Sequence, residues 1–260
     1  NFDAKVNAHN RGTLAAKGSF DPKRQRYDID ADAHSFPVDE FVPDLKIGKL
    51  TAKVKARGEK FDFLKSGTKI DATVDLGSVE YDHQVYKDLT GNVYLDGNRF
   101  DGHINSTNPN CDVYADAYGT INGDHYTIDL KGNVRDLDLQ ALKVLDIPCD
   151  GQGNIDLQGD FNLKTKTYNA NVKLSNLDWN YNGEKIFSEE TDLRLNTSNN
   201  SISAYYNEQS TYINFNAPHS IDDFVNRFKH CADIAQRQYK KMNLDANEIC
   251  DALPRFDLNV

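Results

Sequence analysis

The sequence has few of the residues that build a thick core or a membrane span. Hydrophobic residues make up 38% of its 260 residues, and it contains one Met and one Trp. No apolar run approaches the roughly 18 residues that a membrane-spanning helix needs. Basic residues number 30 against 40 acidic ones, which gives a net charge of −10. We therefore expect a thin core and no nucleic-acid partner, because the phosphates would be repelled.

Motifs for catalysis or metal binding are also missing. The four cysteines form no CxxC pair and no His lies at zinc-ligand spacing, so we expect no metal and no cofactor. Cys231 and Cys250 could form a disulfide if two C-terminal helices fold back on each other. The sequence contains no P-loop, GxGxxG, GxSxG or HExxH, and its seven histidines are scattered. We expect no catalytic residue and no enzyme activity.

The dominant pattern is an alternation of apolar and polar residues, which is typical of half-buried β-strands. Ile70 and Val74, for example, alternate with Asp71 and Asp75. Turn residues separate successive runs, so neighbouring strands are expected to pair as antiparallel hairpins. The turns predict four registers, which place Phe20 opposite Tyr27, Val93 opposite Phe100, Gly119 opposite Tyr126 and Leu163 opposite Tyr168.

One face of the expected strands is unusually light, with Gly and Ala where a sandwich would place larger residues. Small residues permit strong coiling or leave space for a molecule that is not protein. The predicted fold class is mainly β: a long, twisted antiparallel meander of roughly fourteen strands, curled into an open trough with an apolar concave face. The residues expected to line this groove are Leu14, Ile29, Val54, Ile70, Val74, Val93, Ile104, Val113, Ile128, Leu130, Ile155, Leu157, Val172 and Leu174.

Short helical interruptions are expected at 38–42, 61–64 and 139–145. After residue 217 the period changes to that of a helix. Ser220 is a good N-cap, and an apolar stripe follows, which comprises Ile221, Phe224, Val225, Phe228, Cys231, Ala232, Ala235 and Tyr239. We expect the stripe to pack on the edge or mouth of the sheet, and the alternative is a membrane-surface helix, because basic residues accompany it.

A second helix is expected to begin at Asp245, with Glu248 in capping-box position, and to end before Pro254. The chain then divides into groove modules at 1–217, a helical segment at 218–254 and the start of a further strand at 255–260. A first residue other than Met and a strand-like end predict that the chain is an internal segment of a longer protein.

Three stretches carry a resemblance to a known family. Residues 38–110, which include "IGKLTAKVKARGEKFDF", residues 146–161, "DIPCDGQGNIDLQGDF", and the tail 220–260 resemble TamB-type translocation and assembly modules of the AsmA-like family, in their Bacteroidetes form. The resemblance implies a β-taco with an apolar groove. It also implies a periplasmic protein anchored in the inner membrane, which reaches an outer-membrane β-barrel protein through regions outside this chain and takes part in phospholipid transport and outer-membrane biogenesis.

The sequence therefore predicts a non-enzymatic conduit segment that binds phospholipid or another acyl-chain lipid. Each buried methylene contributes roughly 0.8 kcal/mol, so half-burying a chain of about 16 carbons provides on the order of 6 kcal/mol. The alternative is a structural or adhesive β-solenoid with a closed core, which should show a fixed repeat length. An enzyme that acts on polysaccharide is a more distant alternative, since it needs convergent carboxylates in a cleft.

Overall fold

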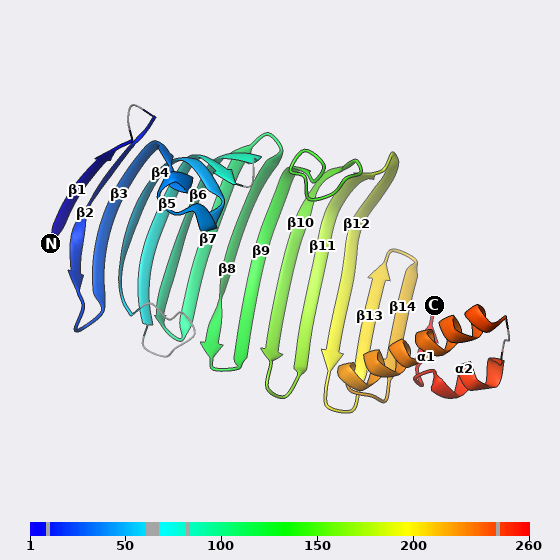
Figure 1. Cartoon of the computed structure of the whole chain (residues 1–260). Helices are drawn as coiled ribbons and strands as arrows, with labels where there is room; N and C mark the ends of the chain where they lie inside the picture. The colour runs from blue at the N-terminus through cyan, green and yellow to red at the C-terminus, as the bar shows by residue number, and fades with distance from the viewer. Residues whose placement is uncertain (9–10, 61–67, 82–83, 243–244) are drawn as a thin grey trace.

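The chain forms one open sheet of fifteen antiparallel strands that follow each other in sequence order. The computed structural model describes residues 1–8, 11–60, 68–81, 84–242 and 245–260. Figure 1 shows the strands side by side in one layer from β1 to β14, with helix α1 beside β13 and β14. The prediction of a mainly β antiparallel meander with a C-terminal helical segment is confirmed.

Most of the strands are ten to fifteen residues long, which is longer than the typical strand of a globular protein. Their bounds are β1 Phe2–Asn7, β2 Thr13–Asp21, β3 Arg26–Pro37, β4 Ile47–Glu59, β5 Thr68–Tyr81, β6 Gln84–Gly97, β7 Arg99–Asn108, β8 Cys111–Asn122, β9 His125–Asp138, β10 Cys149–Asn162, β11 Thr167–Tyr181, β12 Glu184–Thr197, β13 Ile202–Glu208, β14 Thr211–Ala217 and β15 Asp257–Asn259. With about 4.8 Å between neighbours, fifteen strands extend for roughly 65 Å.

One of the four predicted hairpin registers is confirmed, and three are wrong by two residues. Phe20 lies opposite Tyr27, as expected. Phe100 lies opposite Leu95 rather than Val93. Tyr126 lies opposite Ile121 rather than Gly119. Tyr168 lies opposite Phe161 rather than Leu163.

Glycine at the first central turn position explains two of these shifts. Gly97 and Gly123 have φ values of +69° and +59°, so the turns are Gly97-Asn98 and Gly123-Asp124 rather than Asp96-Gly97 and Asn122-Gly123. A turn that needs a left-handed first central residue selects glycine there. Because each shift is even, every side chain stays on the face that the alternation predicts.

A line of irregular pairings crosses the sheet near one end of the strands. Register shifts fall between Ala33 and Phe36, at Thr51/Ala52, at Asp112/Val113 and at Gly151/Gly153. Strands β3, β6 and β11 also hold a residue with positive φ near this line, which are Ser35, Asp88 and Asn176. Bulges of this kind bend a strand and increase its twist.

Glycines near the opposite end of the strands sit against a neighbouring backbone. A Cβ at Gly18, Gly58 or Gly119 would lie 2.0, 2.2 or 1.9 Å from the carbonyl oxygen of the adjacent strand. Aromatic rings cover two of these positions, since the Tyr27 ring lies over Gly58 and the Phe100 ring over Gly119. Only glycine allows this close approach.

The short interruptions differ from their predicted helices. Residues 38–45 form two 3₁₀ turns, η1 Val38–Glu40 and η2 Pro43–Leu45. Residues 139–145 form turns and no helix, because Asp138 binds the backbone N–H groups of Gln140 and Ala141 and Lys143 takes a left-handed φ of 54°. The interruption predicted at 61–64 lies outside the described residues.

The two C-terminal helices, α1 Ile221–Lys241 and α2 Ala246–Ala252, begin at their expected caps. The Ser220 side chain accepts a hydrogen bond from Asp223 N, and Asp245 accepts from Glu248 N. The expected return bond of a capping box is replaced, because Asp245 N donates to Gln238 Oε1 on α1 instead. The buried Gln238 therefore joins the two helices.

A glycine-to-alanine pair tests the close backbone approach. Gly119→Ala should lower the free energy of unfolding by about 2 kcal/mol, because its Cβ would collide with the Thr127 carbonyl oxygen and force the strands apart. Gly102→Ala is the matched control on the next strand, where the nearest atoms lie 3.8 and 3.9 Å from the added Cβ. Urea unfolding of both variants measures the difference. Equal stability of the two would contradict the close approach of β8 and β9.

Candidate ligand-binding face

Direct pairing across the ladders defines one face of the sheet, which we call face A. Opposite residues in an antiparallel pair project to the same side. Face A consists of four rows that cross the strands. The first row is Phe20, Tyr27, Gly58, Ile70, Leu95, Phe100, Gly119, Ile128, Gly159, Ala170, Leu195, Ala204, Phe215 and Leu258.

The other three rows run parallel to the first. The second is Phe2, Gly18, Ile29, Ala56, Ala72, Val93, Gly102, Ala117, Leu130, Leu157, Val172, Leu193, Tyr206 and Ile213. The third is Ala4, Ala16, Ala31, Val54, Val74, Gly91, Ile104, Ala115, Gly132, Ile155, Leu174, Thr191, Glu208 and Thr211. The fourth is Val6, Leu14, Ala33, Ala52, Leu76, Leu89, Ser106, Val113, Val134 and Gly153.

The register places every predicted groove residue, from Leu14 to Leu174, in these four rows. Most of them are half-buried, Ile70 is buried at 6% exposure, and Val93 and Ile104 are exposed at 41% and 38%. Residues in the middle of a two-layered core would be covered much more completely. Their role in lining a lipid groove stays a prediction.

The opposite face, which we call face B, carries charged pairs that join neighbouring strands. Lys17–Asp30, Arg57–Asp71, Lys69–Asp96 and Lys131–Asp156 are directly opposite in register and form ion pairs of 2.5 to 3.7 Å. Each exposed pair contributes little free energy by itself. Together they make face B the solvated side of the sheet.

His103, Tyr114 and Asp116 form the most connected titratable cluster on face B. The His103 Nδ1 atom lies 2.8 Å from Asp116 Oδ1, and the Tyr114 hydroxyl donates to Asp116 Oδ2 at 2.6 Å. These hydrogen bonds, first that of Tyr114, hold the pKa of Asp116 below its ordinary value. The three side chains satisfy one another, with no nucleophile beside them among the described residues, so the cluster is best explained as a strand-to-strand contact.

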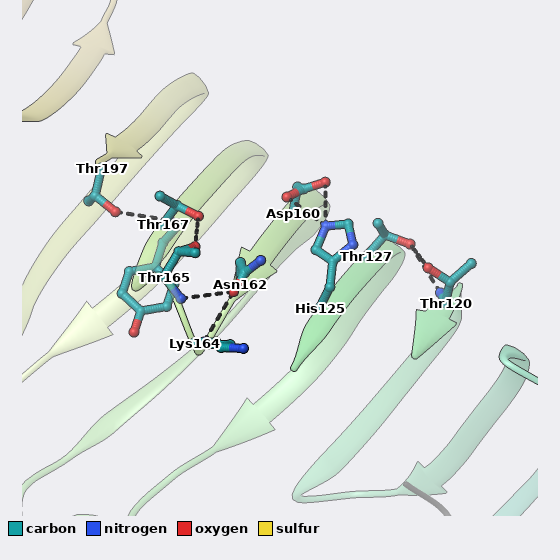
Figure 2. Close-up of polar contacts among 10 residues, drawn as sticks. Thr120, His125, Thr127, Asp160, Asn162, Lys164, Thr165, Thr167 and Thr197 are labelled. Carbon is teal, nitrogen blue, oxygen red and sulfur yellow. Dashed lines mark hydrogen bonds and ion pairs between the residues drawn. The ribbon is translucent and has the colours of Figure 1, made fainter. Parts of the chain in front are cut away.

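A further set of polar contacts follows the rim where β8 to β12 turn. Figure 2 shows His125 beside Asp160, Thr120 beside Thr127, and Asn162 within its own hairpin turn. His125 Nε2 lies 3.0 Å from Asp160 Oδ1. The contacts join neighbouring strand ends and do not converge on one point. We therefore interpret them as contacts that stabilise the strand pairing rather than as a catalytic site.

A hollow of about 380 Å³ lies on face A between β11 and β14. Its lining residues come from four adjacent strands and include Val172, Leu193, Tyr206, Ile213 and Phe215. A larger hollow of about 790 Å³ lies at the ends of β2 to β6. Charged residues around that larger hollow form the ion pairs Arg26–Glu59 and Arg57–Asp71.

Helix α1 contacts the sheet through its first turns. The ring centroid of Phe224 lies 5.4 Å from that of Phe215, which lines the face A hollow. Further along, Cys231 and Ile234 are buried, and the Cys231 Sγ lies 3.7 Å from the Ile249 carbonyl oxygen of α2. Phe228 and Tyr239 are exposed at 55% and 81%. The expected packing of the stripe on the sheet is therefore confirmed for Phe224 and is wrong for Tyr239.

All four cysteines are free thiols, so Cys231 and Cys250 are not joined in this structure. The described residues hold no group of three His, Cys, Asp or Glu side chains arranged for a metal ion. Within the same residues, no helix has both the length and the apolar character for crossing a membrane. Comparison with protein-family models, with curated proteins and with solved structures gives no match.

The sequence missed the end of face A that borders α1. The predicted lining stopped at Leu174, whereas the rows continue through β12 to β14 and include Leu193, Tyr206 and Phe215. The alternation of Ile202, Ala204 and Tyr206 is a signal that could have extended the prediction. No sequence pattern identified the hollow, because its lining comes from four separate strands that the ladders bring together.

The Asp116 contacts predict a shift in titration. Tyr114→Phe removes the first cause of the lowered pKa, so the pKa of Asp116 should rise toward its ordinary value. Carboxyl NMR signals followed over pH measure it, with Tyr118→Phe on the same strand as the control. Because the folded pKa is lower than the unfolded one, the contribution of Asp116 to stability is present above the unfolded pKa and is lost as pH falls. An unchanged pKa in Tyr114→Phe would assign the shift to His103.

Proposed function

We propose that face A binds the acyl chains of lipids, and that this chain is a segment of a conduit that carries phospholipid between two membranes. The observation that carries the proposal is the continuity of the rows of mostly small and aliphatic residues, of which the second and third run from β1 to β14. They remain partly exposed, as Val93 and Ile104 illustrate. Soluble monomers rarely leave apolar patches beyond a few hundred Å² uncovered, and larger ones mark binding surfaces.

The dimensions of face A suit an acyl chain. Four rows separated by two residues span about 20 Å along the strands, whereas one leaflet of a bilayer core is about 15 Å thick. The fifteen strands extend the face to roughly 65 Å across. From β1 to β12 a lipid tail therefore finds the same kind of surface at every strand, because no residue of the four rows on these strands carries a formal charge.

We further infer that the sheet is curled into a trough with face A on the concave side. The line of bulges at Ala33/Phe36, Asp112/Val113 and Gly151/Gly153 supports curvature at one end of the strands. The close approaches at Gly58 and Gly119 support it at the other end. A trough of this kind is the β-taco that the resemblance to TamB-type modules implies, with a periplasmic location and an outer-membrane β-barrel protein as the partner of the whole protein.

The closed structural solenoid is the second candidate. It requires that side chains of the sheet itself fill the space above face A. The partial exposure of Val93 and Ile104 and the small volume of Gly91, Gly102 and Ala115 favour an uncovered face instead. The two candidates differ in their response to a charge introduced on the face.

Arginine at Ile128 tests lipid binding. Ile128→Arg should weaken the binding of a fluorescent neutral diacylglycerol at least tenfold, because a charge then lies in the path of the acyl chains, a cost of about 1.4 kcal/mol or more. Its stability should fall by only about 1 kcal/mol, since a half-buried site lets the guanidinium reach water. Fluorescence titration and thermal unfolding measure the two effects.

Gln158→Arg is the matched control, because Gln158 lies on face B of the neighbouring strand and is exposed. It should leave both lipid binding and stability unchanged. A large loss of stability in Ile128→Arg would return the interpretation to a closed core. Unchanged lipid binding in Ile128→Arg would remove face A from the mechanism.

A further inference from the structure

One charged side chain interrupts face A. Among the described residues that form its four rows, Glu208 is the single one with a formal charge. Its row neighbours are Thr191 on β12 and Thr211 on β14. A carboxylate on an otherwise uncharged face costs binding energy for acyl chains unless it has a partner of its own. Its position therefore calls for a specific explanation.

Hydroxyl groups surround this carboxylate. The Tyr206 hydroxyl donates a hydrogen bond to Glu208 Oε2. Ser188 also contributes a hydrogen bond that lowers the pKa of Glu208, after the larger effect of Tyr206. Ser188 Oγ in turn lies 3.0 Å from Thr191 Oγ1, and both of these side chains are buried. The hydrogen bonds of Tyr206 and Ser188 thus favour the ionised form of the carboxyl group.

No positive charge balances Glu208 within the described part of the chain. None of the ion pairs there includes it, and the causes of its lowered pKa are hydroxyl groups alone. On the neighbouring strands, Lys173 and Arg194 lie on face B and project to the other side of the sheet. The cluster therefore presents a negative charge and hydroxyl oxygens on face A.

The cluster borders the hollow between β11 and β14. Tyr206 lines that hollow and also donates to Glu208, so one side chain belongs to both features. In the adjacent row, Leu193 and Ile213 flank Tyr206 and form part of the apolar lining. Apolar surface and carboxylate thus lie one row apart, about 7 Å along the strand.

We propose that Glu208 and its hydroxyl partners bind the primary ammonium head group of an amphiphile whose acyl chain occupies the hollow. This inference rests on the proposed lipid-binding function of face A. A primary ammonium carries three N–H donors, and the half-buried carboxylate of Glu208 offers it acceptor oxygens on face A. An anionic head group would meet the carboxylate charge directly, and a trimethylated one has no N–H to donate.

Lipids that differ only in the head group test the proposal. The three competitors are phosphatidylethanolamine, phosphatidylcholine and phosphatidylglycerol with the same acyl chains, presented in micelles of a neutral detergent. Each competes with fluorescent diacylglycerol for binding to the complete protein. The ethanolamine lipid should compete about tenfold better than the glycerol lipid, which is the effect of one charge-assisted hydrogen bond. Glu208→Gln should abolish this preference, and Glu208→Lys should invert it.

The control is Glu190→Gln, which removes the same charge from face B of the adjacent strand β12. It should keep the full preference for the ethanolamine lipid. Binding of the neutral diacylglycerol without a head-group preference would overturn the assignment of Glu208 and leave the proposed function standing. A preference that survives in Glu208→Gln would do the same. Absence of diacylglycerol binding would overturn both proposals.

Discussion

Pairing between neighbouring strands is the constraint on which this structure depends, because the sheet has one layer (Figure 1). A two-layered domain gains stability by burying one face of a sheet against another element. Here face A stays partly exposed from β2 to β12, so the backbone ladders and the side-chain pairs across them must hold the strands. The directly opposed charges of face B, such as Arg57–Asp71 and Lys131–Asp156, favour the native register over its neighbours.

The sequence was sufficient to assign side chains to faces but not to set the exact pairing. Alternation has a period of two, so it assigns Ile128 and Leu130 to face A whatever the turn does. The register depends on where the turn places its left-handed residue. At Gly97 and Gly123 glycine takes the first central position, which moved the pairing by two residues. A shift of two residues leaves the hydrophobic pattern unchanged, so that pattern cannot detect it. Three of the four predicted registers were wrong by such a shift.

The features that distinguish one end of face A from the other could not be predicted from the sequence. Glu208 precedes a two-residue turn, where polar residues are common, so the sequence does not distinguish it from an ordinary turn residue. Its position on face A is evident only from the strand pairing, which places it in one row with Thr191 and Leu174. The exposure of Phe228 and Tyr239 was likewise not predictable, since they share their helical stripe with Phe224, which contacts the sheet.

Glycine has two roles on face A that together explain its composition. At Gly58 and Gly119 it lets the strands approach closely, and it also lets the rings of Tyr27 and Phe100 lie down on the sheet. An uncharged apolar surface binds every methylene of an acyl chain about equally, so it gives a ligand little preference for one position along the face. Under the proposed function, Glu208 supplies that position, because it carries the one formal charge among the residues of the four rows.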